Sequence, residues 1–298
     1  MLILLSYAAV VVFVVGAVYR TWKIRRMPMH LRWELAPVPH EKGKAYYGGS
    51  YFEDHEWWTK RREKSLANEL WYMFQEIVFL KGIWKHKRDL WYFSFPFHFG
   101  GLYLVGASVG LLFLGAISGL NGSFASVLNI LIEVLLGTGY LMGGFGVLGL
   151  LYRRLNDPDV KPFSTFAHYF NLLFLLGIYA SGLYAMFSMQ RFVADLTGFA
   201  VSLITFNPDF ELAAPAVLHV FLACAFLIYL PFTYMMHFIA KYFFYHDIRW
   251  NDEPMTAGGK MEKEVTRLLG QKTTWSAPHI NGQGKKTWVD VATEEVKK

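Results

Sequence analysis

Four histidines of this sequence fall within long apolar stretches, where an imidazole is uncommon and usually has a function. They are His98, His168, His219 and His237. Neutral imidazole is a common axial ligand of haem iron. His219 and His237 are eighteen residues apart, so on one helix they would leave the same face about 27 Å apart. This spacing predicts two haem groups stacked across a membrane. The alternative is two histidines that hydrogen-bond to nearby backbone or hydroxyl groups.

A haem held by two imidazoles needs its second ligand from a facing helix. His98 and His237 are expected at the same inner depth, so the sequence predicts that they share one haem. His219 would lie in the outer half, where no other histidine is expected. Three interpretations stay open: His168 serves the inner haem or a quinone pocket, a methionine completes an outer haem, or there is one haem only. The candidate methionines are Met186 and Met189.

A carboxylate and several cations could assist such a centre. Glu133 is the one carboxylate expected deep in an apolar helix, where it could accept a proton from a quinol that delivers electrons to a haem. The alternative is a protonated glutamic acid that hydrogen-bonds for helix packing. Four basic residues could neutralise haem propionates, or could be present for topology alone: Lys85, Arg88, Arg153 and Arg154. The single cysteine, Cys224, excludes an internal disulfide, a covalently attached haem and an iron–sulfur cluster held by this chain alone.

The elements that position these residues are five apolar segments. The chain is 54% hydrophobic and 17% charged, against about a quarter charged in soluble domains. A span of the hydrocarbon core takes about 20 apolar residues. The segments that qualify are 2–19, 92–118, 124–151, 163–189 and 214–241. The sequence therefore predicts an all-α membrane protein with a bundle of five transmembrane helices.

The basic residues predict how this bundle is oriented, because Lys and Arg are held on the cytoplasmic side. Of the 29 lysines and arginines, only Arg191 falls in the loops that would face outward. We therefore expect a multi-pass protein of the cell (inner or plasma) membrane with its N-terminus outside and its C-terminus in the cytoplasm. The net charge of +6 lies beside apolar spans, so anionic lipid is the expected partner for it and nucleic acid is not.

The loop after the first helix and the C-terminal tail are too long to be simple connectors. Apolar residues at helical spacing over 66–83 predict an interfacial amphipathic helix in the first cytoplasmic loop. The tail carries Trp275 and Trp288 in a polar context, which favours docking to a partner protein. The predicted regions are a first transmembrane helix (1–20), a cytoplasmic loop (21–91), a four-helix haem-binding core (92–242) and a cytoplasmic partner-docking tail (243–298).

Three segments resemble the di-haem cytochrome b gamma subunit of respiratory nitrate reductase. They are FPFHFG (95–100), RRLNDPDVKPFSTFAHYFNLL (153–173) and LHVFLACAFLIYLPFTYMMH (218–237), and the likeness covers about 90–245. In that family two histidines ten residues apart on the second helix pair with two on the fifth. The first matches His98, and ten residues further on this sequence has Ser108. The resemblance implies haem b and a role as one component of a quinone-linked oxidoreductase complex, rather than an enzyme by itself.

The loop and the tail resemble a subgroup of related proteins in sulfur-metabolising anaerobes. The segments are RWELAPVPH (32–40), MFQEIVFLKGIWKHKRDLW (73–91), TTWSAPHI (273–280) and KKTWVD (285–290). They look like the cytochrome b subunits of sulfite-reductase-associated and transmembrane cytochrome complexes. The resemblance implies menaquinone, a cytoplasmic heterodisulfide-reductase-like iron–sulfur partner and a further partner in a periplasmic multihaem cytochrome c. The direction of electron flow stays open, and the alternative from another class is a haem-free scaffold or transporter subunit.

Overall fold

The computed structural model of the chain is helical in the residues that it describes, which are 1–27, 53–60, 65–119, 122–245, 257–274 and 284–295. Five helices are long and apolar enough to cross a membrane, which confirms the predicted fold class. They are Leu2–Arg25, Arg88–Ser118, Ser123–Asn156, Phe166–Ser188 and Ala214–Phe232. The predicted motifs at 32–40 and around Trp275 lie outside the described residues.

The chain divides into two compact units. The first consists of Met1–Ala17 and Leu70–Met235, and the second of Val18–Glu69 and Met236–Lys298. The first unit holds most of the apolar helical core and three of the four histidines at membrane depth, and the second holds His237.

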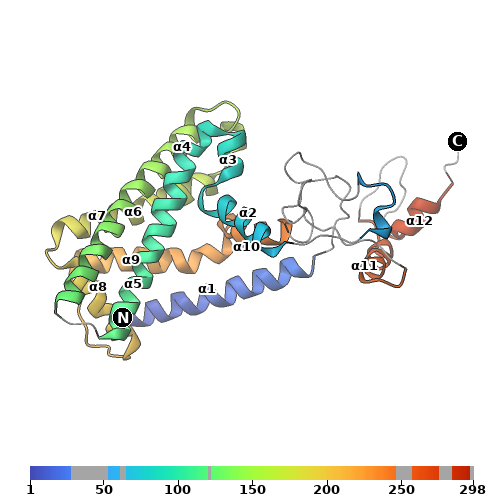
Figure 1. The fold of residues 1–298 in the computed structure, drawn as a ribbon. Helices are drawn as coiled ribbons and strands as arrows, with labels where there is room; N and C mark the ends of the chain where they lie inside the picture. The colour runs from blue at the N-terminus through green and yellow to red at the C-terminus, as the bar shows by residue number, and fades with distance from the viewer. Residues whose placement is uncertain (28–52, 61–64, 120–121, 246–256, 275–283, 296–298) are drawn as a thin grey trace. The chain divides into compact units, whose positions relative to one another are not determined.

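The second span is three helical segments in one continuous run, and it packs along the longest helix (Figure 1). It consists of α4 (Arg88–Pro96), a π-helical stretch η3 (Phe97–Leu104) and α5 (Val105–Ser118), beside α6 (Ser123–Asn156). Pro96 lacks the N–H that a regular helix requires, and a π turn is a common way to accommodate such a break. The two helices can approach closely because Gly149 has no side chain. A Cβ at that position would lie 2.0 Å from the Phe93 ring.

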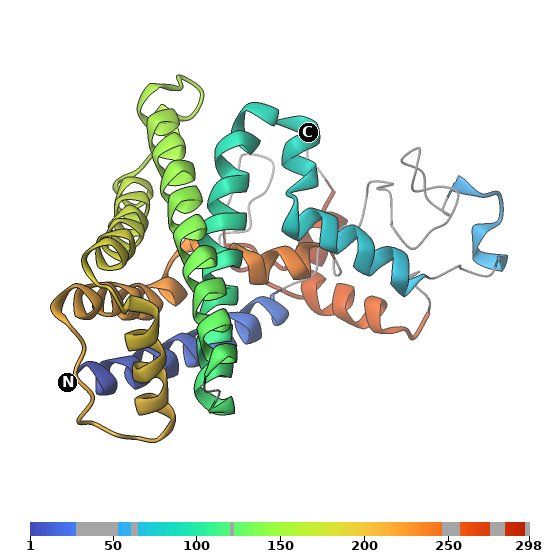
Figure 2. The same ribbon diagram turned by 60° about the vertical axis from the view of Figure 1, so that its left-hand side comes forward.

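The remaining helices of the first unit close the core around α6. Helix α7 (Phe166–Ser188) contacts both α6 and α9 (Ala214–Tyr229); Figure 2 shows α7 in yellow beside the green α6. Between α7 and α9 the structure adds a helix that the sequence did not predict, α8 (Phe192–Ile204), which packs on α5. The N-terminal part of α1 (Leu2–Arg25) joins this unit through hydrogen bonds, among them one from Tyr7 Oη to the Leu203 carbonyl at 2.6 Å.

The fifth span differs from the prediction of one helix over 214–241. After α9 the chain forms two short 3₁₀ turns, η5 (Leu230–Phe232) and η6 (Tyr234–Met236), before α10 (His237–Phe243). Pro231 ends the α-helix because its ring removes a backbone donor and clashes with the preceding turn. Thr233 is extended and accepts the Met235 N–H at 3.1 Å, so it starts the next turn. His219 and His237 therefore do not belong to one unbroken helix, and the shared face expected from their spacing does not hold for this segment.

The predicted amphipathic helix is also divided. It appears as α2 (Leu66–Val78) and α3 (Lys81–His86). Leu80 between them has a left-handed backbone (φ 51°) and is buried. This conformation is costly for a residue other than glycine, and here it lets the chain turn while the leucine side chain leaves water. The prediction of an amphipathic segment was right, and its continuity to Ile83 was wrong.

The described part of the tail forms a small hairpin in the second unit. Helix α11 (Lys260–Leu269) contacts α12 (Trp288–Thr293), and an antiparallel bridge joins Lys272 to Thr287. Hydrogen bonds from Thr287 hold the Asp290 carboxylate at the start of α12 and keep the pKa of Asp290 below its usual value.

Candidate functional site

His98 lies in the π-helical stretch of the second span and is half-buried. Its Nδ1 is 2.7 Å from the carbonyl oxygen of Ser94, one turn earlier. A carbonyl only accepts, so Nδ1 of the neutral ring carries the hydrogen and Nε2 carries the lone pair. A second hydrogen bond of this kind fixes the ring of most metal-binding histidines. The arrangement therefore has the tautomer and the orientation that an axial haem ligand needs.

His168 has the opposite tautomer. It lies in the first turn of α7, where its Nδ1 accepts the backbone N–H of Thr165 at 2.9 Å and completes a capping box. The neutral ring then carries its hydrogen on Nε2. Its ring also packs 5.0 Å from that of Tyr234. His168 thus caps a helix in this structure, and Nε2 does not offer a lone pair to iron.

His219 is buried in the core of the first unit, and both of its ring nitrogens are hydrogen-bonded. The Ser181 hydroxyl donates to the Ile178 carbonyl at 2.9 Å, so its oxygen accepts the hydrogen of His219 Nδ1 at 3.1 Å. Nε2 then accepts the Tyr140 hydroxyl at 2.8 Å. The Tyr140 and Phe192 rings meet the imidazole edge-on, with centroids 5.3 and 6.1 Å away. A haem at His219 would require iron in the position that the Tyr140 hydroxyl occupies.

Arg153 supplies the clearest site for an anionic group. Its Nε lies 2.8 Å from Asp157 and its Nη2 lies 3.1 Å from Asp89, which ties α6 to α4. The side-chain hydrogen bond to Arg153 keeps the pKa of the Asp157 carboxyl below its usual value. Nη1 is buried and has no hydrogen-bond partner among the described residues. Such a donor is costly to leave unpaired, and a carboxylate such as a haem propionate would pair with it.

A family model for the nitrate reductase gamma subunit matches residues 84–250. The chain belongs to this family. The matched range contains α4 to α10 and all four histidines described above. No curated protein and no solved structure matches the chain. Gamma-family subunits are haem b membrane subunits of quinone-linked oxidoreductases, so this is a multi-pass membrane component of a multi-subunit complex.

Haem b, the cofactor of the gamma family, can be tested against the residues present. At His98 the residues fit, because Nδ1 is held by a carbonyl and Nε2 presents its lone pair. The orphaned Nη1 of Arg153 gives a second point of agreement on the same pair of helices. At His219 the tautomer is suitable, but Nε2 already accepts a hydrogen bond from Tyr140.

The other predicted site residues of this gamma-family chain lie on α10, on α6 and at the end of α7. His237 is the first residue of α10 and is exposed; it belongs to the second unit, so its pairing with His98 stays a prediction. Glu133 lies on an exposed position of α6. Met186 and Met189 pack against the hydrophobic core.

Sequence reasoning missed three residues that set the state of the histidines: Ser94, Tyr140 and Ser181. Ser94 gave a local signal, because it lies four residues before His98 and therefore one turn away on a helix. Tyr140 gave a weaker signal, as the hydroxyl-bearing aromatic within the glycine-rich segment 137–146. Ser181 gave none, since its contact with His219 joins helices 38 residues apart in sequence.

Proposed function

We propose that this gamma-family subunit binds one haem b through His98 and carries electrons between menaquinone and an iron–sulfur partner protein. The hydrogen bond from His98 Nδ1 to the Ser94 carbonyl carries the proposal, because it leaves the Nε2 lone pair directed away from its own helix turn. A bound haem supplies one-electron chemistry at its iron. The protein supplies the ring orientation, the apolar surroundings and the cations for the propionates.

Two further residues have proposed roles at this haem. The orphaned Nη1 of Arg153 would donate to a propionate, while its salt bridges with Asp89 and Asp157 hold the guanidinium in place. His237 is proposed as the second axial ligand. Support for His237 comes from the sequence alone, through its place in the motif at 218–237 and its expected depth in the membrane.

The proposal for the rest of the complex also rests on sequence. The segments 73–91 and 285–290 resemble those of subunits that work with heterodisulfide-reductase-like iron–sulfur proteins and menaquinone. The basic loops favour a cytoplasmic location for that partner, with the N-terminus outside. A periplasmic multihaem cytochrome c is proposed as a further partner. Glu133 is exposed on its helix, a position from which it could take a proton from a quinol that diffuses in the lipid.

The proposal is tested by the haem content of the purified full chain or its complex. We expect a b-type band in the reduced-minus-oxidised spectrum and one haem per chain by pyridine haemochrome. His98→Ala should abolish the band. The matched control is His86→Ala, an exposed histidine near the start of the same span that should leave the band unchanged. A wild-type chain without a b-type band, or full haem content in His98→Ala, would reject the proposal; the first result would favour the haem-free scaffold.

A further inference from the structure

A cavity of about 400 Å³ lies where the second span begins. Its size is within the range of small-molecule sites, roughly 300–1,000 Å³. It is lined by Trp71, Gln75, Phe79, Lys81, Trp84 and Trp91. Four of these residues precede residue 84, where the match to the gamma-subunit family begins. The cavity is therefore built largely by a part of the chain that the family likeness does not cover.

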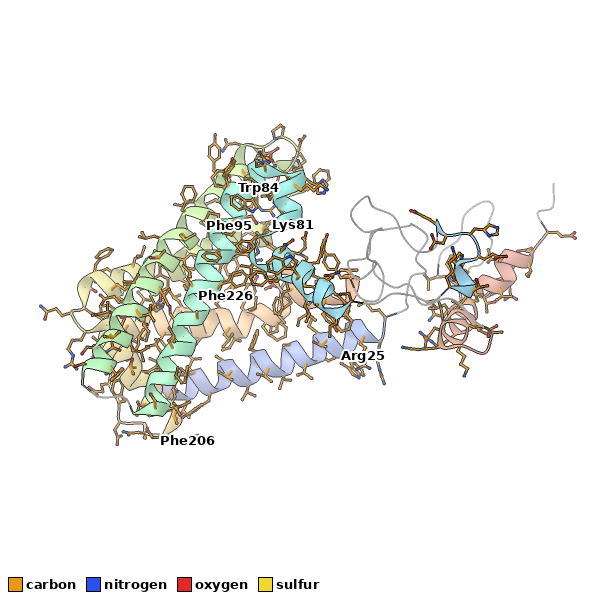
Figure 3. All side chains as sticks on the ribbon, viewed as in Figure 1. Arg25, Lys81, Trp84, Phe95, Phe206 and Phe226 are labelled. Atoms are coloured by element: carbon orange, nitrogen blue, oxygen red, sulfur yellow. The ribbon has the colours of Figure 1, made fainter. Side chains whose placement is uncertain are left out.

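Local structure fixes the walls of this cavity. The left-handed turn at Leu80 separates α2 from α3 and leaves Lys81, at the start of α3, within hydrogen-bond distance of Gln75 on α2. Trp91 on α4 donates its indole N–H to the Phe79 carbonyl at 2.8 Å. The Trp84 and Trp91 rings meet at 4.6 Å between centroids and 68° between planes. Figure 3 shows Lys81 and Trp84 near one another at this end of the unit, with Phe95 close by.

The lining combines flat aromatic faces with few polar groups. Three indoles and a phenyl ring offer surfaces on which a planar ring can stack. Lys81 Nζ donates to Gln75 Oε1, which leaves the Gln75 amide N–H₂ as a second donor beside the ammonium. Lys81 is the one cation in the lining, whereas phosphate groups are usually held by several charged or backbone donors. The chemistry suits an apolar planar ring that carries acceptor oxygens.

We propose that this cavity binds the ring of a quinone, with Lys81 donating to one of its carbonyl oxygens. A lipid-soluble ligand could reach it, because the cavity adjoins the start of the span at Arg88, at the membrane boundary. This site rests on the proposed function, because the haem proposed at His98 is the group with which a quinone here would exchange electrons. Trp91 precedes His98 by seven residues on the same helical run, which is roughly 10 Å along the axis. The Trp91 ring stacks on that of Phe95, which lies between Trp91 and His98 in sequence, with 4.5 Å between the ring centroids.

The test uses the full chain in phosphatidylcholine nanodiscs, titrated with menadione while tryptophan fluorescence is followed. The wild type should show saturable quenching. Lys81→Ala should weaken the apparent affinity about tenfold, the effect of one lost charge-assisted hydrogen bond. The matched control is Lys87→Ala, an exposed lysine just after α3 that is outside the lining. A double variant, Trp84→Phe with Trp91→Phe, should lose most of the saturable signal.

Several outcomes would overturn the quinone site. Equal affinities in Lys81→Ala and Lys87→Ala would do so. A second such outcome is competition by phosphatidylglycerol: if added phosphatidylglycerol abolishes the quenching by menadione, and this effect requires Lys81, the cavity holds a lipid headgroup. Gel filtration and the b-type band serve as checks on folding for each variant. A missing b-type band with intact, Lys81-dependent quenching would reject the haem proposal and leave the quinone site standing.

Discussion

The hydrogen bond between Tyr140 and His219 gives the sharpest prediction about the core. Tyr140→Phe removes one hydroxyl and keeps the ring, which is 1% exposed and packs against Gly182. No cavity larger than an oxygen atom results. The change therefore isolates the bond of 2.8 Å from Tyr140 Oη to His219 Nε2.

The expected size of the effect follows from burial. His219 is 7% exposed, so its Nε2 would lose its partner away from water, which typically costs about 1–3 kcal/mol. Hydrogen bonds between membrane helices are worth less on average, about 0.6 kcal/mol and up to about 1.7, because the unfolded chain finds other partners in the membrane. The two ranges overlap at about 1–1.7 kcal/mol. We expect Tyr140→Phe to lower the unfolding free energy by about 1 kcal/mol.

The assay is reversible unfolding in mixed detergent and SDS micelles, with haem content measured on the same preparations. Tyr152→Phe is the matched control, because Tyr152 lies on the same helix with its side chain exposed. It should change the unfolding free energy by less than about 0.5 kcal/mol. The haem content should be equal in both variants and in the wild type.

Two results would refute this account of His219. One is an unfolding free energy for Tyr140→Phe that equals that of Tyr152→Phe. The other is a loss of half the haem in His219→Leu, since His219 would then be an iron ligand and the hydroxyl would have no bond to lose.

Three further predictions concern packing, pH and a helix cap. Gly16→Ala should destabilise the chain by about 1–3 kcal/mol, because the new Cβ would lie 2.4 Å from the rigid ring of Pro231. Asp157→Asn should destabilise the chain at neutral pH. Since the Arg153 hydrogen bond lowers the folded pKa of Asp157 below 3.8, the difference should persist above that pH and vanish as the pH falls through the lowered value. His168→Ala should cost about 1 kcal/mol through the lost cap and leave the haem content unchanged.

One control variant and two contradicting outcomes test these three predictions. Gly144→Ala should be neutral in the unfolding assay, because a Cβ there meets nothing within 4 Å. A difference between Asp157→Asn and wild type that grows as the pH falls would contradict the sign given above. Loss of haem in a stable His168→Ala protein would show that His168 acts as a ligand and not as a cap.

The spans were predictable because a membrane helix needs only length and apolar composition, both of which are local properties. The interruptions of helices were harder. Pro231 is visible in the sequence, yet the eighteen-residue spacing of His219 and His237 invited a single regular helix. Leu80 carried no signal, because leucine rarely adopts the left-handed conformation. Helix α8 (Phe192–Ile204) is too short to count as a span and lies in a segment treated as a loop.

The chemistry of the site was only partly predictable, for a physical reason. The hydrogen bond that orients His98 is made within four residues, so both of its partners lie in one short stretch of sequence. The bonds that decide the state of His219 come from Tyr140 and Ser181, which are 79 and 38 residues away in sequence. Residue type and depth identify a candidate ligand, whereas the nitrogen that carries its hydrogen depends on which helices meet there.

The difference between His98 and His219 bears on the number of haems. Both rings have the tautomer that an iron ligand needs, and at His219 the buried Tyr140 hydroxyl already donates to Nε2. Iron at that position would leave the Tyr140 hydroxyl without its partner in the core, at a cost of about 1–3 kcal/mol. A second haem would therefore have to move Tyr140 as well as find its own opposite ligand. Ser108, ten residues after His98, is fully buried and already donates to the Leu104 carbonyl at 2.8 Å. These contacts support the proposal of one haem per chain, which pyridine haemochrome measured against protein concentration would distinguish from two.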